Sequence, residues 1–546
     1  DEAHRRADAA QRIIGAALTD LFGEAPSPSA ASELVMDPLP TEQEIVAALA
    51  PYGFAQPLEA GKVLAELAQE SSPFLSTRKC RHYLAKIAPA LLSSLSRTTS
   101  PDHALSVLAR VVDSLGAKGA LWELFLANPP SMELCVRLCA YAPYLSHILI
   151  ANPGFIDELV DSLQLARLPS LAAMESRLND LCKGVELEQA IHEFKSALHL
   201  RIGVRDILGK EEISTTHQAL GQTAEAILRR VVAEQIRDLT AKHGVPIAEP
   251  DGKECGYVLL ASGKVGALEP NYHSEIDFAL IYQADGATRP ASRQMTSVSC
   301  AHFFGQAAQR SLRRLTSRGR LGQLFTVNSE LRPLGVQGPL AVSMEALAPH
   351  YLEGERTWRE LLWLCKARPV GGDAALAAQV QELLRAALSR ASIRRAQVEE
   401  FRQFRREQAA GARPLNLKRA PGGTLHIELL AQFLQLAYAE RFPRILTPGT
   451  LDALARLQRE GLLSASEASL LSGHYRFLRT LESRLRLMNT QVRHDLPQQE
   501  PELRALAAFV GGGSPDVLQE ECVSALRDVE AAIAAREVRL AKELPD

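Results

Sequence analysis

The sequence has few aromatic residues, no excess of charge of either sign and no long apolar run. Aromatics make up 5% of its 546 residues, and 61 Lys and Arg stand against 64 Asp and Glu, for a formal net charge of −3. A nucleic-acid-binding surface needs excess positive charge, so nucleic acid is not an expected partner. Disordered chains are poor in apolar residues, whereas 46% of these residues are hydrophobic. No apolar stretch reaches the ~18 residues of a membrane span, so we expect no membrane contact and a cytoplasmic location.

Cysteines are also few, and their spacing does not indicate a structural metal or a disulfide framework. The chain has eight, none in a CxxC pair. Cys135 and Cys139 lie one helical turn apart, but no His-rich segment accompanies them, so packed, reduced thiols are favoured over metal ligands. The chain begins at Asp1 rather than Met, with no signal-peptide pattern, and we expect it to be a piece of a longer chain.

Most of the chain has the apolar spacing of amphipathic helices. One helix is predicted over 105–115 with Gly116 as its stop, and another over 217–243 with Gly244 as its stop. From about 41 to 213 we expect helices only. The prolines between 26 and 40 bracket a Ser/Ala-rich segment, which predicts a linker after a short N-terminal helix.

The pattern changes at Cys255, where short apolar runs predict strands. We expect strands over 256–261, 276–282 and 322–327, with a helix over 297–317 before the third. The fold class is therefore mostly α with a small mixed α/β domain. The predicted domains are an N-terminal helix and linker (1–40), a helical region (41–214), a sheet-containing domain (215–375) and a C-terminal helical bundle (376–546).

The segment 261–282 has the residues most suited to chemistry. A strand leads into a turn with Gly263 and Lys264, and a second strand begins with Glu275 and Asp277. Side chains at i and i+2 of a strand share a face, so the two carboxylates can hold a hard cation such as Mg²⁺. The glycine turn and lysine can meet the phosphates of a nucleotide that shares the ion. By itself, this pattern is more typical of an ordinary hairpin that carries an exposed acidic pair.

This segment resembles the signature of the glutamine synthetase adenylyltransferase/adenylyl-removing enzyme family, G-x-G-K-L-G-G-x-E-x-N-x-x-S-D-I/L-D. Further segments resemble family motifs in the same order, so the resemblance covers about 42–540. They are Leu138–Leu145 and Asn152–Leu159, Thr326–Gly335 (D-x-R-L-R-P-x-G), Trp358 with Lys366–Asp373 (W-E…A-R-x-x-x-G-D), Asn416–Glu428 (D-x-K-x-x-x-G-G-x-x-D-I-E-F) and Tyr475–Glu482.

The resemblance implies one half of a two-half enzyme, in which a polymerase-β-like nucleotidyltransferase domain is paired with a helical bundle and the active cleft opens between them. One family activity adds AMP from Mg²⁺–ATP to a tyrosine of glutamine synthetase, and the other removes it by phosphorolysis. Implied partners are glutamine synthetase, a PII-type nitrogen-signalling protein and a second catalytic half. The implied site residues are Glu275, Asp277 and Asn328 for catalysis, Glu275 and Asp277 for the metal, and Ser262, Gly263, Lys264, Ser274, Arg332, Lys418 and Glu428 for the nucleotide.

Four acidic positions of the family motifs differ here. Glu275 replaces the first metal aspartate, and Asn328, Asn416 and His426 replace three further carboxylates. A longer ligand can displace a metal by ~1 Å, and a neutral ligand binds Mg²⁺ more weakly. Two hypotheses follow: a transferase with impaired activity, or a catalytically dead pseudoenzyme half with a regulatory or scaffolding role.

Several other polar residues have competing interpretations. The arginines between 310 and 320 predict a solvated helix face more strongly than a phosphate or partner contact. His426 is expected to be packed or hydrogen-bonded rather than a base, and His199 and His217 are expected to be structural. Trp358 and Trp363 are expected in the core.

Overall fold

The computed structural model describes residues 29–158, 167–249, 252–320, 322–328, 334, 338–354, 356–511 and 513–546. It divides into two compact units, Asp1–Ala140 and Tyr141–Asp546. Each is described by itself. The predicted N-terminal helix falls largely outside the described residues, and the domain boundaries near 40, 214 and 375 remain predictions.

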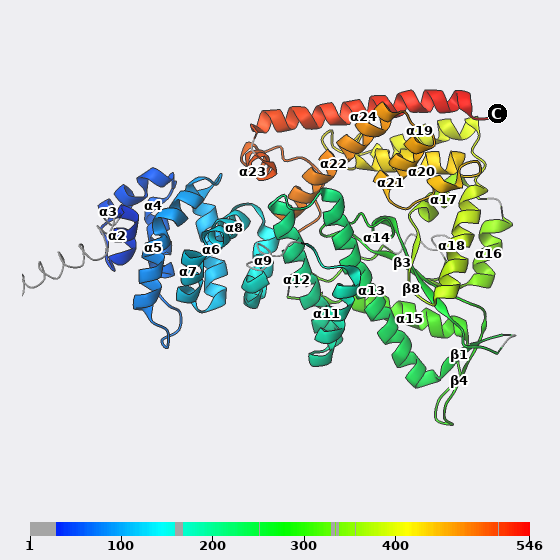
Figure 1. Cartoon of the computed structure of the whole chain (residues 1–546), viewed down its shortest axis with the longest axis horizontal. Helices are drawn as coiled ribbons and strands as arrows, with labels where there is room; N and C mark the ends of the chain where they lie inside the picture. Colours follow the sequence, from blue (N-terminus) through cyan, green and yellow to red (C-terminus); the bar gives the residue numbers. More distant parts are fainter. Residues whose placement is uncertain are drawn as a thin grey trace, which may run out of the picture. The chain divides into compact units, whose positions relative to one another are not determined.

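The first unit is built from helices whose ends follow ordinary capping rules (Figure 1, blue to cyan). In α6, Ser100 caps the first turn, Pro101 occupies its first position, and Gly116 ends the helix with a φ of 70°. The predicted stop at Gly116 is confirmed. The elements are α2 (Ala30–Met36), α3 (Glu42–Leu49), η1 (Ala50–Tyr52), α4 (Pro57–Leu67), α5 (Thr77–Ser96), α6 (Pro101–Leu115), α7 (Lys118–Ala127) and α8 (Pro129–Tyr141), which includes the boundary.

The predicted linker is wrong over 30–36, where the chain forms α2. Ser29 caps this helix by accepting the Ser32 N–H at 3.2 Å, and Ala31, Leu34 and Val35 are buried. A cap followed by a short apolar face is enough for one packed helix. The linker was predicted because prolines lie on both sides of this short helix.

The second unit begins with helices that lead to the sheet, the longest of which is α13 with 31 residues. It ends at Gly244, as predicted, and packs against α11, α12 and α15 (Figure 1). These elements are α9 (Pro143–Ala151), η2 (Pro153–Phe155), α11 (Leu171–Gly184), α12 (Leu187–Ile207), α13 (Ile213–His243) and α15 (Cys300–Leu315).

A four-stranded mixed sheet in the order β7-β3-β2-β8 forms the centre of this unit. Strands β2 and β3 are antiparallel, with Tyr257 opposite Tyr282 and Ser262 opposite Asp277. Both are almost fully buried. The bounds are β2 (Tyr257–Ser262), α14 (Gly263–Gly266), β3 (Asp277–Tyr282), β7 (Ala341–Ser343) and β8 (Arg368–Gly372), with small ladders β1 (Val245–Ala248) to β4 (Gly286–Arg289) and β5 (Arg318–Gly319) to β6 (Gly322–Gln323).

Two of the strand assignments differ from those predicted. The run 322–327 is a strand only over Gly322–Gln323, and Val327 adds one isolated parallel bridge to Ile276. Strand β8 was not predicted, because Pro369 and two glycines disfavour a strand. Proline is tolerated there because β8 is an edge strand that pairs with β2 alone.

A helical bundle completes the second unit (Figure 1, yellow to red). Its core joins sheet residues such as Val258 and Ile281 to bundle residues such as Phe433. Trp358 is buried in this core and Trp363 packs against it, as predicted. The elements are α16 (Met344–Leu352), α17 (Trp358–Cys365), α18 (Ala374–Ser389), α19 (Arg395–Ala409), α20 (Thr424–Tyr438), η3 (Pro443–Ile445), α21 (Thr450–Arg459), α22 (Ala465–Met488), α23 (Glu500–Val510) and α24 (Pro515–Glu543).

The predicted fold class, mostly α with a small mixed α/β domain, is confirmed. In the described part of the chain, no single helix has the length and apolar composition to cross a membrane, although α8 and α9 pass that test when taken together.

Two glycines give a matched test of the packing around the sheet. A Cβ at Gly266 would lie 2.0 Å from the Lys366 carbonyl oxygen, whereas a Cβ at Gly305 in α15 meets nothing within 4 Å. We expect Gly266→Ala to lower the free energy of unfolding by about 1–3 kcal/mol or more, because backbone atoms must move. Gly305→Ala should raise it by about 0.5–1 kcal/mol through helix propensity. Urea denaturation of both variants measures the difference, and equal stabilities would contradict this packing.

Candidate active site

The central strands β2 and β3 end side by side at a glycine turn. Ser262 ends β2 opposite Asp277, the first residue of β3. Gly263 follows with a φ of 58°, and a Cβ built on it would lie 2.3 Å from Oδ2 of Asp277. A side chain at 263 would displace that carboxylate, so the turn requires glycine.

Three predicted catalytic residues share this edge of the sheet. Glu275 is exposed, and Asp277, two residues later, is buried. The parallel bridge between Ile276 and Val327 sets Asn328 next to Asp277 in register. The Asn328 N–H donates to the Ile276 carbonyl at 3.1 Å. The structure therefore brings Glu275, Asp277 and Asn328 together.

The environment of Asp277 suits a cation. Burial, reinforced by the nearby charge of Glu275, raises the pKa of Asp277 to about 7, while Lys418 opposes this rise. Oδ1 of Asp277 and Oγ of Ser262 are buried with no hydrogen-bond partner. A bound cation would satisfy the orphaned oxygen and neutralise the acidic pair. Glu275 and Asp277 therefore fit one hard metal ion, although no group of three or more metal-ligating His, Cys, Asp or Glu occurs in the described ranges.

Lys264 of the turn is tied to the bundle by a buried chain of ion pairs. Its ammonium group pairs with Glu428 of α20, which also pairs with Lys366 at 2.7 Å. Lys366 reaches Glu269 at 3.2 Å. These four alternating charges connect the glycine turn, the segment before β8 and α20, and they fix the sheet against the bundle.

Hydroxyl groups complete this chain of charges. Tyr475 of α22 donates to Glu428 at 3.1 Å, and Thr450 of α21 donates its hydroxyl to Glu269 at 2.9 Å. Burial opposes ionisation of Glu428, but Lys264, Lys366 and Arg479 outweigh it and hold the pKa of Glu428 well below its ordinary range. Burial is the largest influence on Lys264 and lowers its pKa, against the attraction of Glu428.

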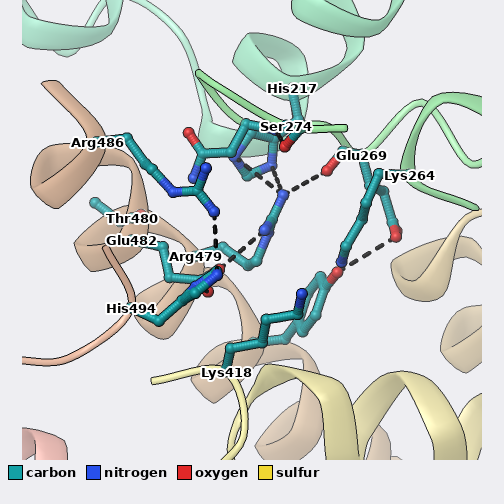
Figure 2. A network of polar contacts seen from close by, with 12 residues as sticks. His217, Lys264, Glu269, Ser274, Lys418, Arg479, Thr480, Glu482, Arg486 and His494 are labelled. Atoms are coloured by element: carbon teal, nitrogen blue, oxygen red, sulfur yellow. Dashed lines mark hydrogen bonds and ion pairs between the residues drawn. The ribbon is translucent and has the colours of Figure 1, made fainter. Parts of the chain in front are cut away.

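A second set of charges lies along one stripe of α22. Arg479 donates to Glu482 at 2.9 Å and to the ring of His217 on α13 at 3.3 Å. Glu482 also contacts His494 at 3.1 Å, and Arg486 donates to the Tyr272 carbonyl at 2.9 Å. Figure 2 shows these residues converging beside Lys264 and Lys418. The stripe holds the segment before Glu275 against the bundle.

The loop that carries Lys418 is stabilised by Asn416. The Asn416 side-chain oxygen accepts the N–H groups of Lys418 and Arg419 at 3.2 and 2.7 Å, and its amide donates to Asp495 at 2.8 Å. An aspartate at 416 would face Asp495 with like charge, so asparagine suits this loop. Lys418 is half-buried, and its charge acts on Asp277.

His426 has the predicted packed role. It is buried, it contacts Arg405 at 2.9 Å and Glu530 at 3.3 Å, and it accepts the Gly422 N–H at 3.3 Å. His217 and His199 are buried too, and their pKa values are lowered well below the ordinary range, chiefly by burial. His217 nevertheless adjoins the charge network through Arg479.

The remaining predicted site residues have different surroundings. The Ser274 hydroxyl accepts the Asn271 N–H at 2.8 Å and so shapes the turn before Glu275. Arg332 lies outside the described residues. Sequence reasoning did not single out Glu269, Lys366, Arg479, Glu482 or His494. The signal in the sequence was the stripe Tyr475, Arg479, Glu482, Arg486, whose spacings of four, three and four put these polar groups on one face of the helix.

Comparison with known proteins gives two family matches. Residues 132–383 match the model of the glutamate-ammonia ligase adenylyltransferase family, and residues 391–538 match that of GlnD PII-uridylyltransferase. The second match covers most of the C-terminal bundle.

Three curated relatives are all described as bifunctional glutamine synthetase adenylyltransferase/adenylyl-removing enzymes. The one from Thioalkalivibrio sulfidiphilus is 29% identical over 84% of this chain and 49% of its own length. That from Xanthobacter autotrophicus is 28% identical over 88% and 48%, and that from Pseudomonas syringae pv. tomato is 30% identical over 78% and 46%. The chain thus spans about half the length of these relatives, and the predicted resemblance is confirmed.

The buried carboxylate Glu482 predicts a pH-dependent contribution to stability. Burial opposes its ionisation, but His494 and Arg479 prevail and lower the pKa of Glu482 to about 2. A lowered folded-state pKa stabilises the fold above the unfolded value of about 4.5, and this contribution disappears as the pH falls from 4.5 towards 2. We expect Glu482→Gln to destabilise the protein by on the order of 3 kcal/mol at pH 7 and by much less near pH 3.

Denaturation midpoints across pH 3–7 measure this difference. The exposed Glu59→Gln variant serves as the control, since Glu59 makes only a surface ion pair with Lys62. A Glu482→Gln effect that stays constant over this pH range would contradict the assignment.

Proposed function

We propose that this chain, which contains a domain of the glutamate-ammonia ligase adenylyltransferase family, is a nucleotidyltransferase half that transfers AMP to or from a tyrosine of glutamine synthetase. The observation that carries the proposal is the packing of the Gly263 turn against Asp277, whose buried Oδ1 has no partner and whose neighbour Glu275 is a second carboxylate. A buried carboxylate with an exposed carboxylate two residues before it, beside a glycine turn, suits an Mg²⁺–ATP site.

Glu275 and Asp277 would hold Mg²⁺, which supplies charge neutralisation at the phosphates when bound. Gly263 lets the backbone approach the nucleotide, and Lys418 brings a positive charge from the bundle side of Asp277. Lys264 pairs with Glu428, so its ammonium group would be shared between that carboxylate and any phosphate that it contacts. In the adenylylating direction, the tyrosine oxygen forms a bond to the α-phosphorus while the bond to pyrophosphate breaks.

Asn328 argues for impaired transfer. It lies beside Asp277 where the family pattern has a carboxylate, and a neutral amide neither binds Mg²⁺ as tightly nor offsets its charge as well. In contrast, Asn416 and His426 form stabilising contacts within the bundle, so their replacement of acids need not weaken the metal site.

The alternative is a non-catalytic half with a regulatory or scaffolding role. Asn328 favours it, and the match of the bundle to the GlnD PII-uridylyltransferase model supports a PII-type protein as a partner. In that case, the bundle would bind a PII-type nitrogen-signalling protein, glutamine synthetase or a second catalytic half. Loss of the metal site would leave the charge network between sheet and bundle intact.

Substitution of Asp277 tests the enzyme hypothesis. We expect Asp277→Ala to reduce transfer of labelled AMP from ATP to glutamine synthetase by at least ~10²-fold, because a misplaced or missing metal ligand costs about that much. Asp238→Ala removes the same charge from the exposed face of α13 and should leave the rate unchanged. Undiminished transfer by Asp277→Ala would remove this site from the reaction.

Asn328→Asp separates the two hypotheses. We expect it to tighten Mg²⁺-dependent ATP binding, measured by calorimetry, and to raise the rate of transfer, because it restores a charged ligand at the sheet edge. Wild-type protein that binds ATP only with Mg²⁺ supports the transferase. Binding that appears only in Asn328→Asp supports the pseudoenzyme, and no binding by either protein contradicts a nucleotide site here.

A further inference from the structure

A cavity of about 660 Å³ lies beside the sheet edge and shares only Ser274 with the site residues described above. We call it the α12 cavity, because α12 supplies His192, Lys195 and Ser196 to its wall. Opposite walls come from α9, from 322–326 and from 490–492, and Ser274 completes the lining next to Glu275. Its volume is that of a small-molecule site.

The lining of the α12 cavity carries two cations, Lys195 and Arg320, and many hydrogen-bonding groups. It includes Lys195, Arg320, His147, His192 and His273, together with the hydroxyls of Ser196, Ser274, Thr326 and Thr490. Among the described residues, no Asp or Glu belongs to the lining. The described lining therefore has cations without acidic partners, whereas in the neighbouring network Glu428 and Glu269 alternate with lysines.

Lys195 is the central charge of this cavity. Its ammonium group donates to the Leu324 carbonyl and lies 4.3 Å from the centroid of the Phe325 ring. An ammonium group has three N–H donors, and no carboxylate of the described residues pairs with this one. Burial lowers the pKa of Lys195 to about 8, so most of it remains charged at pH 7.

A half-buried cation with no carboxylate partner among the described residues is costly, and an anion in the cavity would relieve that cost. The aromatic walls, Phe325 and Tyr144, leave the rest of a ligand in apolar surroundings. Tyr144 is itself held by a 2.7 Å hydrogen bond to His199. This part of the cavity wall is therefore preformed in the absence of a ligand.

We propose that the α12 cavity binds a small organic or inorganic anion, a phosphate or a carboxylate, through Lys195. Segment 322–326 forms one wall, and its continuation carries Asn328, so the ligand would contact the segment that leads to the acidic edge. The proposal does not depend on AMP transfer, because binding requires neither Mg²⁺ nor nucleotide.

Calorimetry on the full chain tests this site at pH 7 in the presence of EDTA. The probes are inorganic phosphate and succinate, which distinguish a phosphate ligand from a carboxylate ligand. We expect one saturable site per chain for at least one probe, at least tenfold weaker in Lys195→Met and within a few fold of wild type in Lys195→Arg. The control Lys183→Met removes an equal charge from an exposed position of α11.

Lys264→Met separates this cavity from the glycine turn. Binding that survives in Lys264→Met and is lost in Lys195→Met supports the α12 cavity. The opposite pattern places the anion at the turn and overturns the proposal, as does the absence of saturable binding by both probes. Should Lys195→Met fail to fold, reductive methylation of wild-type protein gives a second measure: the probe must protect Lys195 but not Lys183, and equal protection contradicts the site.

Discussion

The ion-pair chain Lys264–Glu428–Lys366–Glu269 is the interaction on which the candidate active site depends. It connects three segments that are far apart in sequence: the glycine turn, the approach to β8, and α20. Removal of one member would leave a buried charge without its partner, which is far more costly than loss of a surface pair. The position of the bundle against the acidic sheet edge is therefore tied to the same lysine that the sequence assigns to phosphate contact.

The chain shows which parts of such a site can be read from the sequence. The strand–turn–strand around Gly263 and Asp277 was predictable, because apolar runs, glycine spacing and an i, i+2 acidic pair are local patterns. Strand β8 was not, since Pro369 disfavours a strand unless an edge position is already known. The roles of Lys366 and Glu269 were not predicted either, because they arise only when segments about a hundred residues apart come into contact. The stripe on α22 was visible in the sequence, but its partners were not.

The structure also changes the meaning of the replaced acids. From the sequence, Asn328, Asn416 and His426 look like equivalent losses. Asn416 instead binds its own loop and Asp495, and His426 contacts Arg405 and Glu530, so each fits its surroundings. Only Asn328 lies at the acidic edge. The question of activity therefore depends on Asn328 and on the longer ligand Glu275, and not on Asn416 or His426.

Helix α13 connects two distant parts of the second unit. At about 1.5 Å per residue, its 31 residues form a rod of roughly 45 Å. Near one end, His217 contacts Arg479 of the bundle, and at the other, His243 contacts the Thr296 carbonyl at 2.9 Å. Because contacts hold both ends, the rod is a rigid connection between the β1–β4 ladder and the charge network, and the two cannot move independently.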